Sequence, residues 1–170
     1  MKRMPSYSWP LLALIAALLP AVSLAAESLT GPEALIVKLY KDYAWEAVID
    51  EPVDSDAGLL QQPVNILNRY FDPHMVSLIL RDRVCEEKNG ICRLDYDPIW
   101  DSQDPGGAMG MKIQQMADPS EVSVDFIYAG HAAHMHIVYV LSQTRDGWRI
   151  SDIQGTTPSL RKLLEADFHP

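Results

Sequence analysis

The sequence predicts an α+β domain in which N-terminal helices pack on a curved antiparallel sheet of three to four strands, with a short C-terminal helix at the end. Residues 121–154 alternate apolar and polar side chains with a period of two, which is typical of strands. Residues 32–83 instead repeat apolar side chains at helical spacing. Helices followed by consecutive strands favour a meander whose apolar face the helices cover.

Residues 121–154 divide into three strands at two turns. Asp146-Gly147 is a preferred two-residue hairpin loop, because both central positions need positive φ. Gly130-His131 offers the other turn, with glycine first as a type II′ turn requires. The segment 111–116 adds a fourth strand at the edge of the sheet.

Counting outward from two-residue loops fixes a register for these strands. One face then collects apolar side chains that must be covered, and the other face is mixed. Asp152 falls on the apolar face and Ile153 on the mixed face, although a slip of one residue at either loop would exchange the faces beyond it. The predicted opposed pairs are Val122–Tyr139, Val124–Ile137, Phe126–Met135, Asp125–His136, Ile127–His134 and Gln143–Ile150.

Four helices are predicted around the sheet. The first covers 32–49, because Thr30 and Glu33 form a capping box before a run of apolar residues at helical spacing. An acidic loop with Pro52 and Gly58 follows over 51–62, and two shorter helices cover 63–71 and 73–83. The last helix covers 160–166 and carries a leucine stripe.

The N-terminus has the order of a secretory signal peptide. Lys2 and Arg3 precede the apolar run 11–19, and small residues at Ser23 and Ala25 suit a cleavage site. The run is too short to cross a bilayer, so we expect no membrane span after cleavage. The expected organisation is a signal peptide at 1–25 and one domain at 26–170, in the periplasm or secreted.

The mature chain is strongly acidic. Removal of the signal peptide takes away two basic residues and no acidic one, so the net charge of −9 becomes −11. A chain of this charge without a basic patch is not expected to bind nucleic acid or an anionic membrane surface.

Cys85 and Cys92 bracket a turn-forming Asn89-Gly90 in a chain that we expect to be exported. An oxidising compartment favours a local disulfide between them. A redox-active pair is the alternative, but the spacing is not Cys-x-x-Cys. We therefore expect a structural disulfide.

Residues 95–104 place four carboxylates beside one tryptophan. Hard oxygen ligands suit calcium, but the spacing is not that of an EF-hand loop, so no metal site is assigned. Aspartates in a solvated turn are the simple interpretation, and partner binding through the tryptophan is the functional one. The binding residues considered in this loop are Asp97, Trp100, Asp101 and Asp104.

Three histidines cluster near the first hairpin. His134 and His136 point to one face at strand spacing, where imidazole pairs can bind zinc or copper. Asp125 stands opposite His136 and can orient it or form an acid/base pair with it. The pattern lacks a clear third ligand unless His131 turns inward, so a structural cross-strand pair is the main interpretation, with no metal or cofactor assigned.

Several of these pieces together resemble the DUF3828 family of bacterial envelope proteins. They are the Asp97–Asp104 stretch with Asp97-Pro98 and Gln103-Asp104, the strands VSVDFIY and HIVYVLS, and GWRISDI before a short helix with two leucines. The resemblance covers about residues 35–164 and implies an NTF2-like, cystatin-like fold. It carries over no catalytic residue, since none is established for the family.

The sequence predicts an exported binding or interaction domain and favours a non-catalytic role. Its partner would be another envelope protein, contacted through the acidic loop and the mixed sheet face, and the chain would be a monomer or homodimer. The alternative is a small-molecule-binding or enzymatic domain with a pocket between the long helix and the sheet. In that case Asp152 is the residue of interest, and the candidate lining residues are Tyr40, Tyr43, Trp45, Tyr139 and Trp148.

Overall fold

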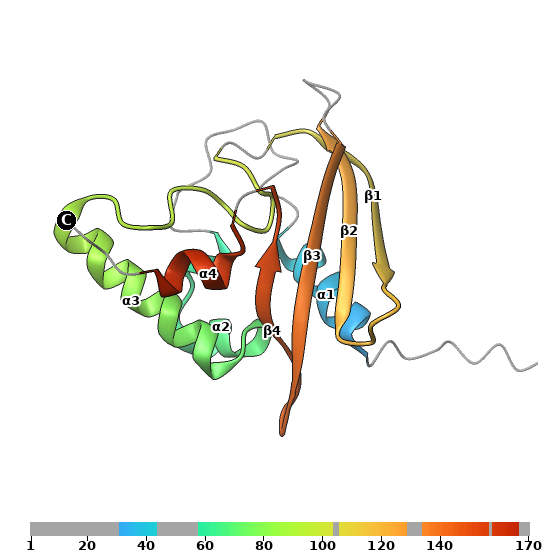
Figure 1. The fold of residues 1–170 in the computed structure, drawn as a ribbon, viewed down its shortest axis with the longest axis horizontal. Coiled ribbons are helices and arrows are strands. Elements are labelled where there is room, and N and C mark those ends of the chain that lie inside the picture. The colour runs from blue at the N-terminus through green and yellow to red at the C-terminus, as the bar shows by residue number, and fades with distance from the viewer. Residues whose placement is uncertain (1–30, 44–57, 104–105, 129–133, 157, 167–170) are drawn as a thin grey trace, which may run out of the picture.

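The computed structural model describes residues 31–43, 58–103, 106–128, 134–156 and 158–166, and in them the predicted α+β class is confirmed. Helices precede a four-stranded antiparallel sheet, and a short helix follows it (Figure 1). In chain order the elements are α1 (Pro32–Tyr43), the 3₁₀ helix η3 (Leu59–Gln61), α2 (Val64–Tyr70), α3 (Pro73–Asn89), β1 (Ala108–Gln115), β2 (Glu121–Tyr128), β3 (His134–Thr144), β4 (Gly147–Gln154) and α4 (Leu160–Glu165).

The strands are arranged in the order β1-β2-β3-β4, so each pairs with its neighbour in sequence. The predicted register of β2 against β3 is confirmed, with Phe126 opposite Met135 and Asp125 opposite His136. The predicted edge strand is β1, which begins three residues earlier than expected. The turn residues Gly130 and His131 lie outside the described residues.

The register of the hairpin between β3 and β4 differs from the prediction by two residues, because Gln143 pairs with Trp148 and not with Ile150. Its loop is Arg145-Asp146, and Gly147, at φ 99°, forms the first pair of β4 with Thr144. The Thr144 hydroxyl donates to the Gly147 carbonyl at 2.7 Å and accepts the Asp146 amide at 3.2 Å, which stabilises the turn in this position. The predicted pair Gln143–Ile150 is therefore wrong.

A β-bulge further along β4 exchanges the faces of its last residues. Leu141 pairs with Ile150 but Val140 pairs with Asp152, so one extra residue is inserted between them. The Ser151 hydroxyl donates to the Val140 carbonyl at 3.1 Å within this bulge. As a result Ile153 is buried at 3 % exposure and Asp152 turns away from the apolar face, which corrects the prediction for both residues.

One of the described helices is longer than expected. The predicted end of the first helix lies outside the described residues, as does Thr30 of its capping box. Helix α3 begins after Asp72, whose carboxylate accepts the Met75 amide at 2.8 Å, and continues to Asn89 instead of ending at residue 83. Gly90, at φ 84°, ends it, because glycine adopts this conformation without a Cβ clash.

The disulfide between Cys85 and Cys92 is confirmed, with a Cα–Cα distance of 5.7 Å. It joins the last turns of α3 to the segment directly after Gly90. The chain reversal that the Asn-Gly pair predicted therefore lies inside the disulfide loop.

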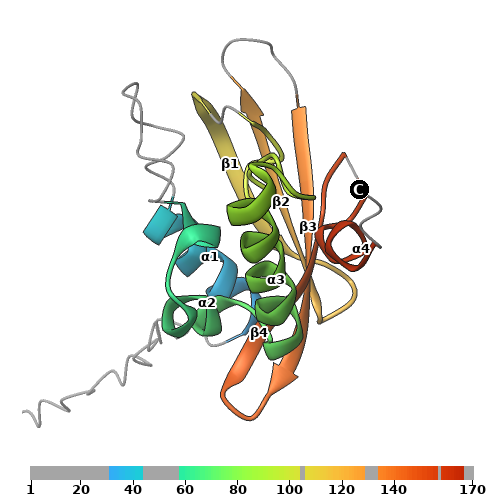
Figure 2. The same ribbon diagram turned by 90° about the vertical axis from the view of Figure 1, so that its left-hand side faces the viewer.

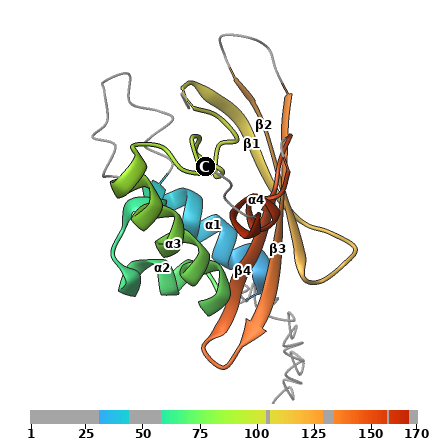
Figure 3. The same cartoon turned by 60° about the vertical axis from the view of Figure 1, so that its left-hand side comes forward.

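Helix α1 crosses the inner face of the sheet and packs on β1, β2 and β4. Figure 3 shows α1, α2 and α3 gathered on one side of the sheet, while α4 packs on α3 and β4. The inner face forms the core with Val122, Val124, Phe126, Ile137, Tyr139 and Ile150, each at most 1 % exposed.

None of the described helices covers the opposite, outer face of the sheet over β1 to β3. In Figure 1, α1 lies behind the sheet and no described helix stands in front of these three strands. Figure 2 shows the same arrangement from the side, with α1 and α2 on one side of the sheet and α4 beside β4. No helix in the described ranges is long and apolar enough to cross a membrane.

Candidate functional site

The acidic loop predicted as a partner site is organised by its own aspartates. The Asp97 carboxylate accepts the Ile99 amide at 2.8 Å, and Asp97 and Ser102 exchange backbone hydrogen bonds of 2.8 and 3.2 Å. The Gln103 side chain donates to the Asp95 carboxylate at 3.3 Å. These bonds close the segment into a compact turn.

Trp100 lies beneath this loop and is only 1 % exposed, so it cannot present a contact surface as predicted. Its ring packs edge-on against Tyr40 at 5.3 Å and against Phe126 at 5.6 Å between centroids. A partner surface centred on Trp100 is therefore excluded, because the indole anchors the loop to the core.

A chain of buried tyrosine hydroxyls holds the loop from below. Tyr40 donates to the Ile99 carbonyl at 2.7 Å and therefore accepts from Tyr139 at 2.9 Å. Tyr128 donates to the Trp100 carbonyl at 2.7 Å. Burial raises the pKa of Tyr40 and Tyr139 well above the usual tyrosine value, and burial raises the pKa of Tyr128 to about 12.

This packing also occupies the space proposed for a pocket. Tyr40 and Tyr139 are at most 3 % exposed and satisfy each other, while Tyr43 and Trp148 are half-buried against the core. Trp45 lies outside the described residues. The aromatic residues on the described part of α1 and the sheet are therefore core residues, not the lining of an open site.

Asp101 connects the acidic loop to the end of β4. Its carboxylate accepts the Thr156 amide at 2.7 Å and the Thr156 hydroxyl at 2.6 Å. It adopts a left-handed backbone at φ 51°, and a Cβ on Gly155 would come within 2.6 Å of its carboxyl carbon. Asp97 and Asp101 therefore have structural contacts, and Asp104 lies outside the described residues.

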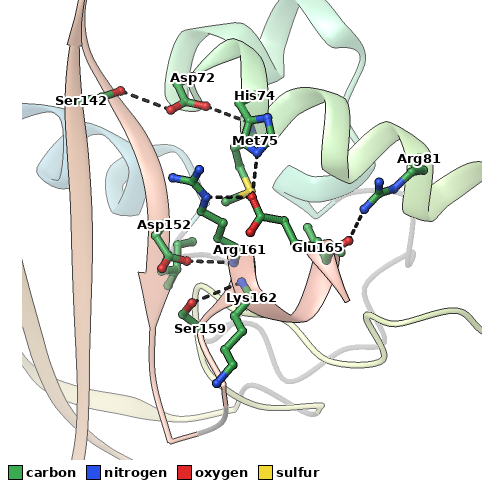
Figure 4. Close-up of polar contacts among 12 residues, drawn as sticks. Asp72, His74, Met75, Arg81, Ser142, Asp152, Ser159, Arg161, Lys162 and Glu165 are labelled. Carbon is green, nitrogen blue, oxygen red and sulfur yellow. Dashed lines mark hydrogen bonds and ion pairs between the residues drawn. The ribbon is translucent and has the colours of Figure 1, made fainter. Parts of the chain in front are cut away.

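Asp152 likewise has a structural role, shown in Figure 4. Its carboxylate accepts a hydrogen bond from the Arg161 amide at 2.8 Å, at the start of α4. Next to it, the Ser159 hydroxyl oxygen caps the helix by accepting from the Lys162 amide at 3.3 Å. At the other end of α4, the Arg81 guanidinium donates to the Leu164 carbonyl. Asp152 thus helps to fix a short helix in place.

The outer face of β1, β2 and β3 carries a different group of residues, which we call the β1–β3 patch. Directly opposed residues of an antiparallel pair share a face, so the strand register sorts the patch into two rows across the sheet. The rows are Met109–Ile127–His134 and Lys112–Asp125–His136. Met109 is 55 % exposed and Ile127 is 41 % exposed.

Within the patch, the predicted pairing of Asp125 with His136 is present. The His136 Nδ1 lies 2.8 Å from the Asp125 carboxylate, and the His134 Nε2 lies 3.8 Å from the same oxygen. The side chains of both histidines are more than half exposed. In the described ranges no three histidine, cysteine or acidic residues are placed to hold a metal ion, and His131 lies outside these ranges.

Met109, Lys112 and Ile127 were not predicted as site residues. The signal for Ile127 was available, since the predicted register placed it beside His134 on the mixed face. Met109 and Lys112 could not be placed, because Gly110 at φ 66° lies in a bulge that shifts the register between them.

Comparisons of the chain with protein-family models, with curated proteins and with solved structures find no match. The structure shows an α+β domain in which core residues fill the inner face of the sheet and no described helix covers the outer face over β1 to β3. The resemblance to DUF3828 stays a prediction.

Proposed function

We propose that the chain is an exported, non-catalytic interaction domain that binds another protein of the envelope through the β1–β3 patch. The single observation that supports this function is the pair Met109 and Ile127, two exposed large apolar side chains that stand directly opposite each other on an uncovered sheet face. Adjacent exposed apolar residues rimmed by polar ones are a common feature of protein contact sites.

The charge of the patch also favours a protein partner. The chain carries a net charge of −9, yet in the patch one lysine stands opposite one aspartate. The net negative charge of the chain repels an acidic partner protein. A nearly neutral patch avoids this repulsion at the point of contact.

The acidic loop has a supporting role in this proposal. Its aspartates fix the loop to the core and to the end of β4. We therefore assign the contact surface to the sheet face and not to the loop. We further propose that the chain has the NTF2-like fold implied by its resemblance to DUF3828, and that a signal peptide at 1–25 directs it to the periplasm. The disulfide is compatible with an oxidising compartment.

The proposal is tested by affinity capture with the mature protein and two matched variants. Ile127→Asp introduces a charge into the patch, and Val64→Asp introduces the same charge at a site of similar exposure on α2, where Val64 is 44 % exposed. An aspartate in the first turn of a helix is favourable, so the control variant keeps its fold.

The expected result is one identified envelope protein that binds the mature protein and the Val64 variant, and binds the Ile127 variant at least tenfold more weakly when the complex is rebuilt from purified components. Equal binding of all three proteins would show that the patch is not the contact surface.

A further inference from the structure

We infer that the free edge of β1 accepts an extended segment of the partner as a fifth strand, and that this segment carries an acidic residue opposite Lys112. The inference rests on the proposed interaction function and specifies the chemistry of its partner.

The two edges of the sheet differ in their protection. At β4 the segment between α2 and α3 covers the edge, because Phe71 forms a parallel bridge with Ile150 and the Asp72 amide donates to the Ile150 carbonyl at 3.0 Å. Arg149 adds a hydrogen bond to the Asn68 carbonyl at 2.8 Å. At β1, β2 is the only strand that pairs with it in the described part of the chain.

The backbone groups at the free edge follow from the pairing. The Met116 amide donates to the Glu121 carbonyl at 3.0 Å, so the pair 116/121 is hydrogen-bonded. Hydrogen-bonded and non-hydrogen-bonded pairs alternate along an antiparallel ladder. Gln114 and Lys112 therefore direct their backbone groups to β2, and Ile113 and Gln115 direct theirs to the free edge.

The composition of this edge differs from that of the rest of the chain. Residues 106–117 contain no acidic residue and one basic residue, Lys112, in a chain with 23 acidic residues. An uncovered edge strand with apolar side chains is a template for strand addition. Here Met111 and Ile113 already pack against the core, so an added strand would extend the inner face under α1.

The same residues disfavour a second copy of the chain as the occupant. A second copy would present its own β1 at this edge, and residues 108–115 contain no acidic residue that could pair with Lys112. The bulge at Gly110 limits the regular edge to the residues after it. A carboxylate on a segment of another protein can pair with Lys112, and so an acidic segment fits best.

The pattern of the partner segment follows from the alternation of the sheet. A residue opposite Ile113 faces inward and should be apolar, whereas the residue opposite Lys112 faces outward and should be acidic. The matching probe is a capped seven-residue peptide of alternating valine and glutamate. The counter-probe replaces each glutamate with lysine.

The test is amide hydrogen exchange, followed by NMR, on the mature protein with saturating peptide. The valine–glutamate peptide should slow the exchange of the Ile113 and Gln115 amides at least tenfold, and the valine–lysine peptide should not. Lys112→Glu should reverse this preference, and Lys162→Glu, the same charge change at an exposed site on α4, should leave it unchanged. Gln115→Pro should abolish the slowing at the Ile113 amide, since proline removes an edge amide that β2 does not use.

Equal slowing by both peptides, or no slowing by either, would overturn the inference. Slow exchange of these amides without peptide would also overturn the inference, because it would show that the edge is already covered. If the exchange rate does not depend on protein concentration, this chain covers the edge. If it does, a second copy covers it. The two proposals separate experimentally. If Ile127→Asp abolishes partner capture while Gln115→Pro does not, the interaction function stands and the strand addition fails.

Discussion

Replacement of Tyr40 by phenylalanine should destabilise the fold more than the same replacement at Tyr139. The Tyr40 hydroxyl lies between two buried partners, donating to the Ile99 carbonyl at 2.7 Å and accepting from Tyr139 at 2.9 Å. Its removal leaves both partners buried and unpaired. An unsatisfied buried polar group costs about 1–3 kcal/mol, so we expect a loss of about 2–4 kcal/mol in the free energy of unfolding.

The loss at Tyr139 should be smaller. Tyr139→Phe removes one hydrogen bond, but Tyr40 still donates to the Ile99 carbonyl, so the expected cost is about 1 kcal/mol. In the Tyr40→Phe background the Tyr139 hydroxyl is buried and unpaired, and Tyr139→Phe removes that hydroxyl. Its replacement should therefore cost about 1 kcal/mol less in the Tyr40→Phe background than in the wild type.

The assay is urea unfolding of the mature protein and the three variants, followed by tryptophan fluorescence. Trp100 reports on this region because its ring lies 5.3 Å from that of Tyr40. Equal losses for the two single variants, or additive losses in the double variant, would refute the hydrogen-bond order Tyr139 to Tyr40 to Ile99.

Three further predictions concern stability. Gly155→Ala should cost about 1–2 kcal/mol, because its Cβ would meet the Asp101 carboxylate at 2.6 Å, and Asp101→Gly in the same chain should recover most of this loss in thermal unfolding. Reduction of the disulfide between Cys85 and Cys92 should lower the free energy of unfolding by roughly 2.5 kcal/mol, to be measured by urea unfolding with and without a reductant, and an unchanged midpoint would contradict this. Alkaline pH should destabilise the fold, since the pKa of Tyr128 is raised from 10.0 to about 12; its contribution is complete below pH 10 and is lost as pH rises through 12, so Tyr128→Phe should show a shallower decline in urea unfolding between pH 10 and 12.

The pattern of the sequence was sufficient for the fold class and for most of the sheet. Alternation along β2 and β3 gave the right opposed pairs, including Asp125 with His136, because a two-residue turn leaves one register in which both apolar faces coincide. The disulfide was also predictable, since its two cysteines are close in sequence and have a turn between them.

The errors have local physical causes. The bulge at Ser151 turned Asp152 away from the core, and a bulge leaves no mark in alternation when serine and aspartate stand side by side. Helix α3 continues past its predicted end at residue 83 to Asn89, because the chain around Cys85 stays helical and Gly90 supplies the conformation that ends the helix.

The candidate site was predictable only in part. Trp100 in an acidic loop has the composition of a contact residue, and only tertiary packing shows that Tyr40 and Phe126 enclose it. Conversely, Ile127 reads as one more strand residue, and it becomes informative only when no helix covers its side of the sheet.

The most direct test of the interaction function is site-specific photo-crosslinking in cells that produce the protein. A photoreactive phenylalanine derivative is placed at Ile127 in one variant and at Val64 in another, two sites of similar exposure on different sides of the molecule. We expect a discrete crosslinked product with another envelope protein from position 127 and none from position 64. No product from either position, or the same product from both, would contradict the claim that the β1–β3 patch is the binding surface.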